Sequence, residues 1–389
     1  MLGTKSVANP ASLIRSVSDR IARSAGVLVL AAACAGFAPD AIAQQLPPVS
    51  TERLSSAQQN QVREYVEERL EILESDAVSQ AEGARARREL IEPMLARDTS
   101  VAMRQAFASA ASDRLADLVA NGSEQQAVSA LFVAGSIADR SSIEILRRGL
   151  NDEREAVEIG AAAGAKAMVR VLDGRLGGAQ AQRQREVQDL LADRLGITQS
   201  GYAAQSIIGA LTALPENAAF LSVSGVAIAD EMTGQVLLRR GGNDPASVLI
   251  SGGWDGAMER ALTAQLAFQR ASAISGVDVS RDTQLQSARL AGISLSLVRD
   301  ALDELDATGA DDAEIRAFLS KQERLIRSAE SLLILVDSNL SGSNRTQDIG
   351  RLIESGDVDD LIDAMNAWVG SRGVLTGAPY SMDESDLGN

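Results

Sequence analysis

The chain has no histidine among its 389 residues, and this absence removes much of the usual chemistry of enzymes. Histidine is the most frequent general acid or base near neutral pH and the commonest protein ligand of metal ions. A Ser-His-Asp triad, a Cys-His pair, a His-ligated zinc site and a His-anchored haem are therefore excluded. Four possibilities remain: carboxylate chemistry, a Ser-Lys pair, a cation bound by oxygen atoms, or no catalysis.

Cysteine and lysine are almost as scarce. Cys34 is the only cysteine, and Lys166 and Lys321 are the only lysines after residue 43. A Ser-Lys nucleophile needs two side chains that face each other. Ser320 directly precedes Lys321, and adjacent residues of a helix point in different directions. The sequence therefore predicts no catalytic residue, no metal ligand and no bound cofactor.

The first 43 residues have the pattern of a secretory signal peptide. A basic start that includes Lys5 is followed by an apolar run over residues 25–38 and by the small-residue cleavage pattern Ala41-Ile42-Ala43. We expect cleavage after Ala43 and a periplasmic or secreted mature protein. The alternative is a lipoprotein in which Cys34, which follows three alanines, is lipid-modified. Only in that case do we expect attachment to a membrane.

After residue 43 the chain is strongly acidic. It has 33 basic and 51 acidic residues, which give a net charge of −18, and only ten aromatic side chains. Nucleic acids are bound through clustered positive charge, so the composition argues against them as partners. Because no cysteine remains after residue 43, no disulfide stabilises the fold.

The clearest internal signal is a repeat. Residues 127–135 align with residues 156–164, which lie 29 positions further on, and four of the nine aligned residues are identical. A capping residue precedes each segment: Ser123 and Asp152 are each placed to accept hydrogen bonds from the free amides of a new helix. The helical periodicity of residues 142–150 predicts a further helix between them. A helix-turn-helix unit that repeats about every 30 residues is typical of an α-solenoid.

The second repeat resembles a bacterial HEAT-type repeat. Leu150, Asp152, Val157 and the pair Ala161-Ala162 match that family's pattern. Where the family usually has an arginine, which forms a ladder with aspartates of neighbouring repeats, this chain has Glu158 and, one repeat earlier, Ser129. The match covers mainly residues 100–172, and it implies an interaction scaffold without naming a ligand.

These patterns together predict an all-α protein, an irregular HEAT/armadillo-like α-solenoid with additional C-terminal helices. After the signal peptide, 1–43, we expect a linker and N-terminal helices at 44–97, HEAT-like repeats at 98–215, a further helical region at 216–369 and a flexible tail at 370–389. Within this, residues 220–240 fit a helix better than the alternative, a β-hairpin that turns at Thr233-Gly234.

Few residues qualify as a binding site. Trp254, in a glycine-rich setting, and Trp368, near the C-terminus, are the tentative contacts with a partner, since tryptophan often contributes strongly to interfaces. The competing interpretation is that both fill the core. The run from Gly160 to Lys166 is close to a phosphate-binding loop, but Ala165 precedes the lysine, so close helix packing explains its glycines better. The acidic clusters near residues 300, 311 and 357 lack the spacing of a calcium loop.

The favoured function is a scaffold or binding protein that holds another protein or a component of the cell envelope. The first alternative is a carboxylate-dependent hydrolase of an envelope polymer, although sugar sites usually present aromatic side chains and few are available here. The second is a structural protein that self-associates through the apolar segment Leu332–Val336.

Overall fold

The computed structural model describes residues 46–387 except 174–177, 241–244, 251, 277 and 344. The predicted signal peptide, its cleavage site and Cys34 lie outside the described residues. Contacts group Gln45–Asn389 into one compact unit. None of the described helices has the length and apolar character that are needed to cross a membrane.

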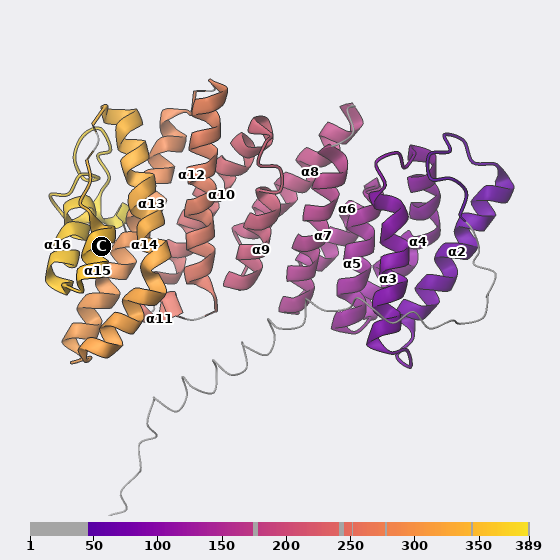
Figure 1. Ribbon diagram of the computed structural model, residues 1–389, viewed down its shortest axis with the longest axis horizontal. Coiled ribbons are helices and arrows are strands. Elements are labelled where there is room, and N and C mark those ends of the chain that lie inside the picture. The colour runs from indigo at the N-terminus through magenta and orange to yellow at the C-terminus, as the bar shows by residue number, and fades with distance from the viewer. Residues whose placement is uncertain are drawn as a thin grey trace, which may run out of the picture. The chain divides into compact units, whose positions relative to one another are not determined.

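The regular structure of the described residues is entirely helical, which confirms the all-α prediction (Figure 1). Residues 220–240 belong to a single helix, so the hairpin alternative is wrong. The α-helices are α2 (Ser56–Glu74), α3 (Gln80–Leu95), α4 (Val101–Asn121), α5 (Glu124–Ile137), α6 (Arg140–Leu150), α7 (Glu155–Asp173), α8 (Gly178–Leu195), α9 (Gly201–Leu211), α10 (Ala218–Arg240), α11 (Pro245–Ile250), α12 (Trp254–Ser275), α13 (Arg281–Ala307), α14 (Asp312–Ser341), α15 (Ile349–Ser355) and α16 (Val358–Val369).

Short polar residues start several of these helices. Ser79 and Ser123 each accept a hydrogen bond from a first-turn amide, and a Glu or Gln three residues later bonds back to the serine amide. Asp311 caps α14 in the same reciprocal way. Such capping boxes satisfy amide groups that have no partner within the helix, and they fix where each helix begins.

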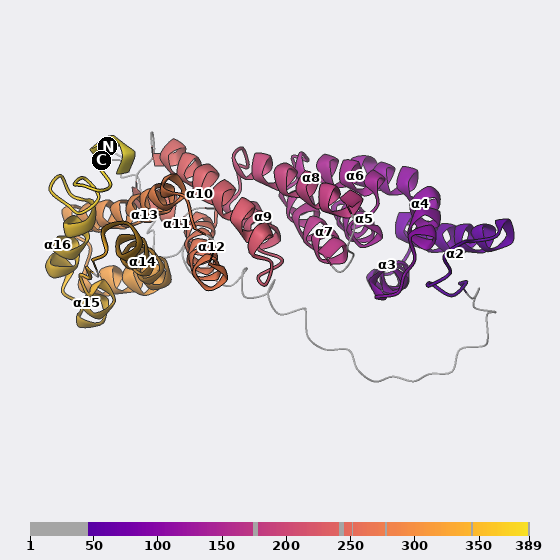
Figure 2. The ribbon, with the colours of Figure 1, turned by 90° about the horizontal axis from the view of Figure 1, so that it is seen from above.

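The helices are arranged as consecutive antiparallel pairs, and the pairs pack in two rows (Figure 2). Row 1 consists of α2, α4, α6, α8, α10, α13 and α16, each in contact with the next. Row 2 consists of α3, α5, α7, α9, α12, α14 and α15, again each in contact with the next. The short helix α11 packs mainly on α13. Each helix of the two rows therefore contacts the other helix of its pair and at least one helix of a neighbouring pair.

A continuous apolar core runs between the two rows. It includes Leu70, Phe107 and Leu146 in the first half and Leu297 and Leu333 in the second, all fully buried. In the segment Leu332–Val336, three side chains are buried within the chain, while Ile334 and Leu335 are only partly covered. Most of this apolar segment is therefore used in the chain's own core.

The prediction of a flexible tail at 370–389 is wrong for the residues described there, which end at Leu387. The segment after α16 folds back onto the helices: Leu375, Tyr380, Met382 and Leu387 are buried. The backbone amides of Val374 and Leu375 donate to carbonyls at the end of α16, and a short 3₁₀ helix, η1 (Glu384–Leu387), packs on α13. Loop-forming residues separate the apolar residues of this segment. The sequence therefore has no helical periodicity there from which the packing could be predicted.

Candidate functional site

The two repeat segments lie within α5 and α7 and meet directly. A Cβ atom at Gly135 would collide with the backbone of Gly164, coming within 2.8 Å of its Cα. One at Gly164 would lie 2.5 Å from the carbonyl oxygen of Leu131, and one at Gly160 would lie 3.0 Å from Val128. The glycines that resemble a phosphate-binding loop therefore allow two helices to pack closely, as the sequence indicates.

The positions that replace the ladder arginine bind arginines from other helices. Glu158 is buried on α7, and its Oε1 accepts a hydrogen bond of 2.6 Å from Nε of Arg194 on α8. Ser129 on α5 lies 3.4 Å from a guanidinium nitrogen of Arg87 on α3. The charge at position 158 is thus opposite to the family pattern, and its partner comes from the next helix pair.

Arg154 is one of the polar links between neighbouring helix pairs. Its guanidinium pairs with Asp152 and also donates bonds of 2.7 Å to the carbonyl oxygens of Gly122 and Val119, at the end of α4. The repeat alignment predicts that Asp152 caps α7. Instead, its carboxylate accepts hydrogen bonds from the backbone amide and the side chain of Arg154, which precedes the helix. The Asp-x-Arg spacing was the available sequence signal, but it does not reveal the two carbonyl acceptors.

The two tryptophans fill the core. Trp368 is fully buried in α16, and Trp254 is 5% exposed at the start of α12. The guanidinium carbon of Arg239 lies 3.7 Å above the centre of the Trp254 ring. Nη2 of the same guanidinium donates a hydrogen bond to the carbonyl oxygen of Thr198. The core interpretation fits this geometry, because both rings are buried.

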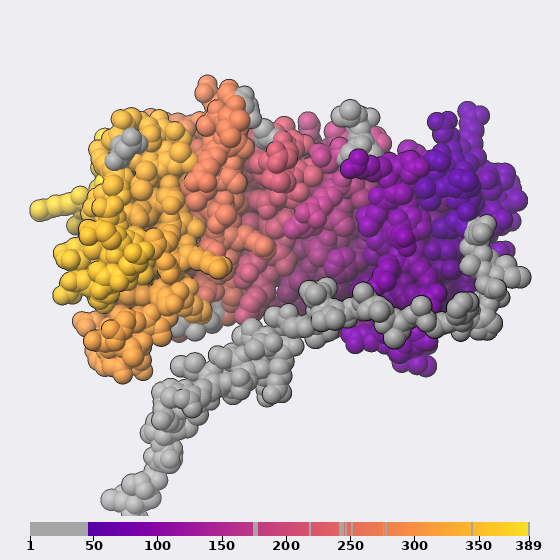
Figure 3. Space-filling view, in the orientation of Figure 1, coloured from indigo at the N-terminus to yellow at the C-terminus, as the bar shows by residue number. Residues whose placement is uncertain are grey.

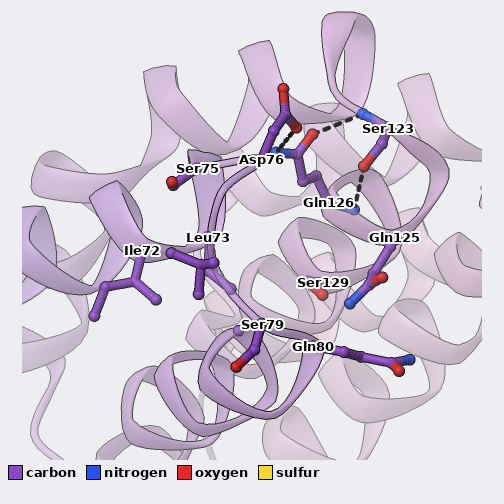
Figure 4. Close-up of a pocket in the computed structure, with 12 residues that line it drawn as sticks. Ile72, Leu73, Ser75, Asp76, Ser79, Gln80, Ser123, Gln125, Gln126 and Ser129 are labelled. Carbon is purple, nitrogen blue, oxygen red and sulfur yellow. Dashed lines mark hydrogen bonds between the residues drawn. The ribbon is translucent and has the colours of Figure 1, made fainter.

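A polar recess of about 160 Å³ lies between the α2–α3 turn and the start of α5 (Figure 4). Gln126 spans one side: its Oε1 accepts from the amide of Ser123 at 2.7 Å, and its Nε2 donates to the carbonyl oxygen of Glu74 and to Asp76. Ser79 and Ser129 line the recess as well. The side chains around it are serines, glutamines, one aspartate and a few apolar residues.

The chemistry of this polar recess suits hydrogen bonding rather than catalysis. Glu82 does not line the recess, but Ser79, which does, donates hydrogen bonds to it from its hydroxyl and its amide. These bonds lower the pKa of the Glu82 carboxyl group and favour its charged form. Among the described residues that line the recess, Asp76 is the one carboxylate.

A second, more open recess of about 600 Å³ lies between α13, α16 and the C-terminal segment. It brings together two carboxylates, Asp363 and Glu384, which is the minimum for two-carboxylate hydrolysis. Both side chains are exposed, and the two arginines Arg299 and Arg372 line the same recess. The recess contains no aromatic platform for a sugar ring.

Among the described residues, three carboxylates have a pKa that burial raises above its usual value, namely Asp230, Glu231 and Asp303, and none of them lines either recess. Burial, together with the neighbouring charges of Asp230 and Asp193, raises the pKa of Glu231 on α10. Glu231 lines neither of the two recesses. Glu231, with the charges of Asp230 and Asp193 close by, therefore lies outside the recess that contains the carboxylate pair Asp363 and Glu384.

The acidic clusters that the sequence displays have structural partners. Asp300 pairs with Arg240 and Arg299, Asp311 caps α14, and Asp357 caps α16. Across the part of the chain that the structure describes, no group of three or more acidic residues is placed to hold a metal ion.

Comparison with models of known protein families and with curated proteins finds no match.

Proposed function

We propose that the mature chain is an exported α-solenoid of HEAT type that binds another protein or a component of the cell envelope without catalysing a reaction. The observation that carries this proposal is the packing of consecutive helix pairs in two rows, each pair against its neighbours. Solenoids are built in this way, and they present long surfaces to which partners bind. In the space-filling view the helix pairs follow one another in chain order (Figure 3).

The chemistry of the recesses supports binding over catalysis. The polar recess has a single carboxylate, and the recess beside α16 has two exposed ones that share it with two arginines. A general acid needs a raised pKa and a position beside the reacting group. Asp230, Glu231 and Asp303, whose pKa values burial raises, line neither recess.

The surface of row 2 is the favoured binding face. Tyr202 on α9 is 46% exposed, and the side chain of Phe132 on α5 is partly exposed with the guanidinium of Arg87 5.6 Å from its ring centre. Tyrosine, phenylalanine and arginine are enriched in protein–protein interfaces.

Affinity capture from an envelope extract tests this function. The tagged protein, expressed with its complete N-terminus so that it can be exported, should retain one protein partner in stoichiometric amount. Tyr202→Glu should abolish capture, whereas Val223→Glu, which changes a similarly exposed residue on row 1, should not. If no partner is retained and the protein degrades an envelope polymer, the hydrolase alternative is correct. A large uniform assembly in light scattering would instead support the self-associating structural protein.

Export is tested on the same material. Mass spectrometry of the purified mature protein should place its N-terminus at Gln44. A lipid-modified N-terminal Cys34 would show that the protein is a membrane-attached lipoprotein.

A further inference from the structure

Three cationic side chains from two helices gather over one point of row 2. Lys166 and Arg170 lie on α7, and Arg260 lies on α12. Between these helices, on α9, a Cβ atom at Gly209 would be 3.2 Å from Nη1 of Arg260 and 3.9 Å from Nζ of Lys166. Glycine at this position therefore leaves room for both charged groups, which approach the same spot. We call these three side chains the cationic cluster.

The cationic cluster is not neutralised within the described part of the chain. No ion pair there joins any of the three side chains to a carboxylate; the polar contact of Arg260 is a 2.8 Å bond to the carbonyl oxygen of Gln205. Some arginines elsewhere are paired closely with acids, as Arg194 is with Glu158. In a chain with a net charge of −18 after residue 43, carboxylates are abundant, so an unpaired group of three cations stands out.

Holding these cations together is unfavourable. Lys166 and Arg170 are four residues apart on one helix, where like charges repel. Partial burial, and then the charges of Arg170 and Arg260, lower the pKa of Lys166. An anion placed between the three groups would relieve this repulsion, and the lysine and arginines remain accessible to solvent.

From this placement we infer that the cationic cluster is a binding site for a carboxylate-rich segment of a partner polypeptide. The inference rests on the proposed function, because it names the chemistry that the row 2 face recognises. Arginine forms paired hydrogen bonds with carboxylates. Exposed Tyr202 lies seven residues before Gly209, on the same side of α9, and offers an apolar contact beside the charges.

The acidity of the rest of the chain does not prevent such binding. At about 0.1 M salt, charges that are more than about 10 Å apart in solvent are largely screened from one another. An acidic segment on the cationic cluster would therefore interact mainly with the three nearby cations. At lower salt the distant carboxylates would repel it, so the affinity for an acidic peptide should not simply rise as salt is removed.

The test uses a fluorescein-labelled peptide of ten glutamates as the probe and the intact mature protein, with anisotropy recorded at about 0.1 M salt. Lys166→Gln/Arg260→Gln should weaken binding by about tenfold or more, since charge-assisted hydrogen bonds are lost. The control, Arg63→Gln/Arg148→Gln, removes two exposed cations from row 1 and should change binding by no more than about twofold. Circular dichroism checks that both variants are folded.

Three results would overturn the inference: no binding of the glutamate peptide by the unaltered protein, equal weakening in both double variants, or tighter binding of inorganic pyrophosphate than of the peptide. The capture experiment separates this site from the general function. A partner that is retained equally by Lys166→Gln/Arg260→Gln would leave the scaffold intact and refute the site. If that variant loses peptide binding and the unaltered protein captures no partner, the site is supported and the general function is refuted.

Discussion

The contact between α5 and α7 and the contact among α12, α13 and α14 are built on opposite principles. In the first, small residues bring two backbones together: Gly135 lies against Gly164, and Ala130, Ala134 and Ala161 are fully buried around them. In the second, longer helices bury polar side chains, among them Gln265, Ser287 and Gln322, each fully buried. The α5–α7 interface depends on close packing of small residues, whereas the α12–α13–α14 interface contains polar groups that need hydrogen-bond partners.

The polar interior of the second region is only partly satisfied. Gln265 donates 2.6 Å to the carbonyl oxygen of Gly225 and accepts from the hydroxyl of Ser287 at 3.0 Å. The amide oxygen and nitrogen of Gln322, by contrast, have no hydrogen-bond partner among the described residues. The comparison therefore predicts that a larger side chain in the first region lowers the stability of the protein. Replacing a buried polar side chain in the second region can either lower or raise the stability, depending on whether that side chain has hydrogen-bond partners.

Gly135→Val is the largest test of the close contact. The new side chain would meet the backbone of Gly164, which cannot rotate away, so the two helices must separate. We expect the free energy of unfolding to fall by about 3 kcal/mol, the upper range for overpacking. Urea unfolding followed by circular dichroism measures it.

Gly234→Ala is the matched control for this contact. Gly234 also lies within a helix, but no atom is within 4 Å of the position of its Cβ. Alanine there should stabilise the protein by about 0.5–1 kcal/mol, because it reduces the freedom of the unfolded chain and favours the helix. If Gly135→Val were as well tolerated as this control, the two repeat helices would not be in direct backbone contact.

The difference between the regions also explains what the sequence reveals. Close packing of Gly135 on Gly164 requires small residues at fixed spacing, so the repeat is visible as a pattern. The placement of Arg154, the cationic cluster and the C-terminal segment depends on which helices become neighbours, and Gly209 meets Arg260 across 51 positions of sequence. Helix periodicity predicts individual helices, but it carries no information on such long-range contacts.

Gln322→Leu and Gln265→Leu should have opposite effects. Leucine at 322 removes a buried amide that lacks partners, so we expect stabilisation by about 1–3 kcal/mol. Leucine at 265 leaves the carbonyl oxygen of Gly225 and the hydroxyl of Ser287 without that partner, and should destabilise by about 2 kcal/mol. Thermal and urea unfolding of both variants decide this. Equal losses in the two variants would mean that Gln322 has a partner after all.

The C-terminal segment adds a charged contact to the second region. Burial alone would raise the pKa of Asp337 on α14, but hydrogen bonds from Ser343, Ser341 and Tyr380 outweigh it and lower that pKa. Burial, and then the charge of Asp337, raises the pKa of Tyr380, so this hydroxyl remains a donor near neutral pH.

Tyr380→Phe removes one donor to a buried carboxylate and should cost about 1.5 kcal/mol at pH 7. Because the pKa of Asp337 is lower in the folded state than in the unfolded chain, its stabilising contribution is complete above the unfolded value and is lost as the pH falls through the folded value. The difference between Tyr380→Phe and the unaltered protein should therefore shrink in acid. Urea unfolding at pH 7 and near pH 3 measures both; a constant difference would place the effect outside the Asp337 contact.

The smallest expected effect lies on the surface of the first region, at Lys166 on α7, and it is compared with Lys321 on α14. Lys166→Met removes a like-charge pair with Arg170 and should stabilise the protein by about 0.2–0.5 kcal/mol near pH 7. Since the folded-state pKa of Lys166 is lowered, its unfavourable charge is present below that value and disappears as the pH rises toward the unfolded value near 10.5. The gain from Lys166→Met should thus decline in alkali. Lys321→Met is the control: this lysine pairs with Asp255 at 3.3 Å, so its removal should not stabilise. If both substitutions stabilised equally, added apolar surface, and not relief of repulsion within the cationic cluster, would be the cause.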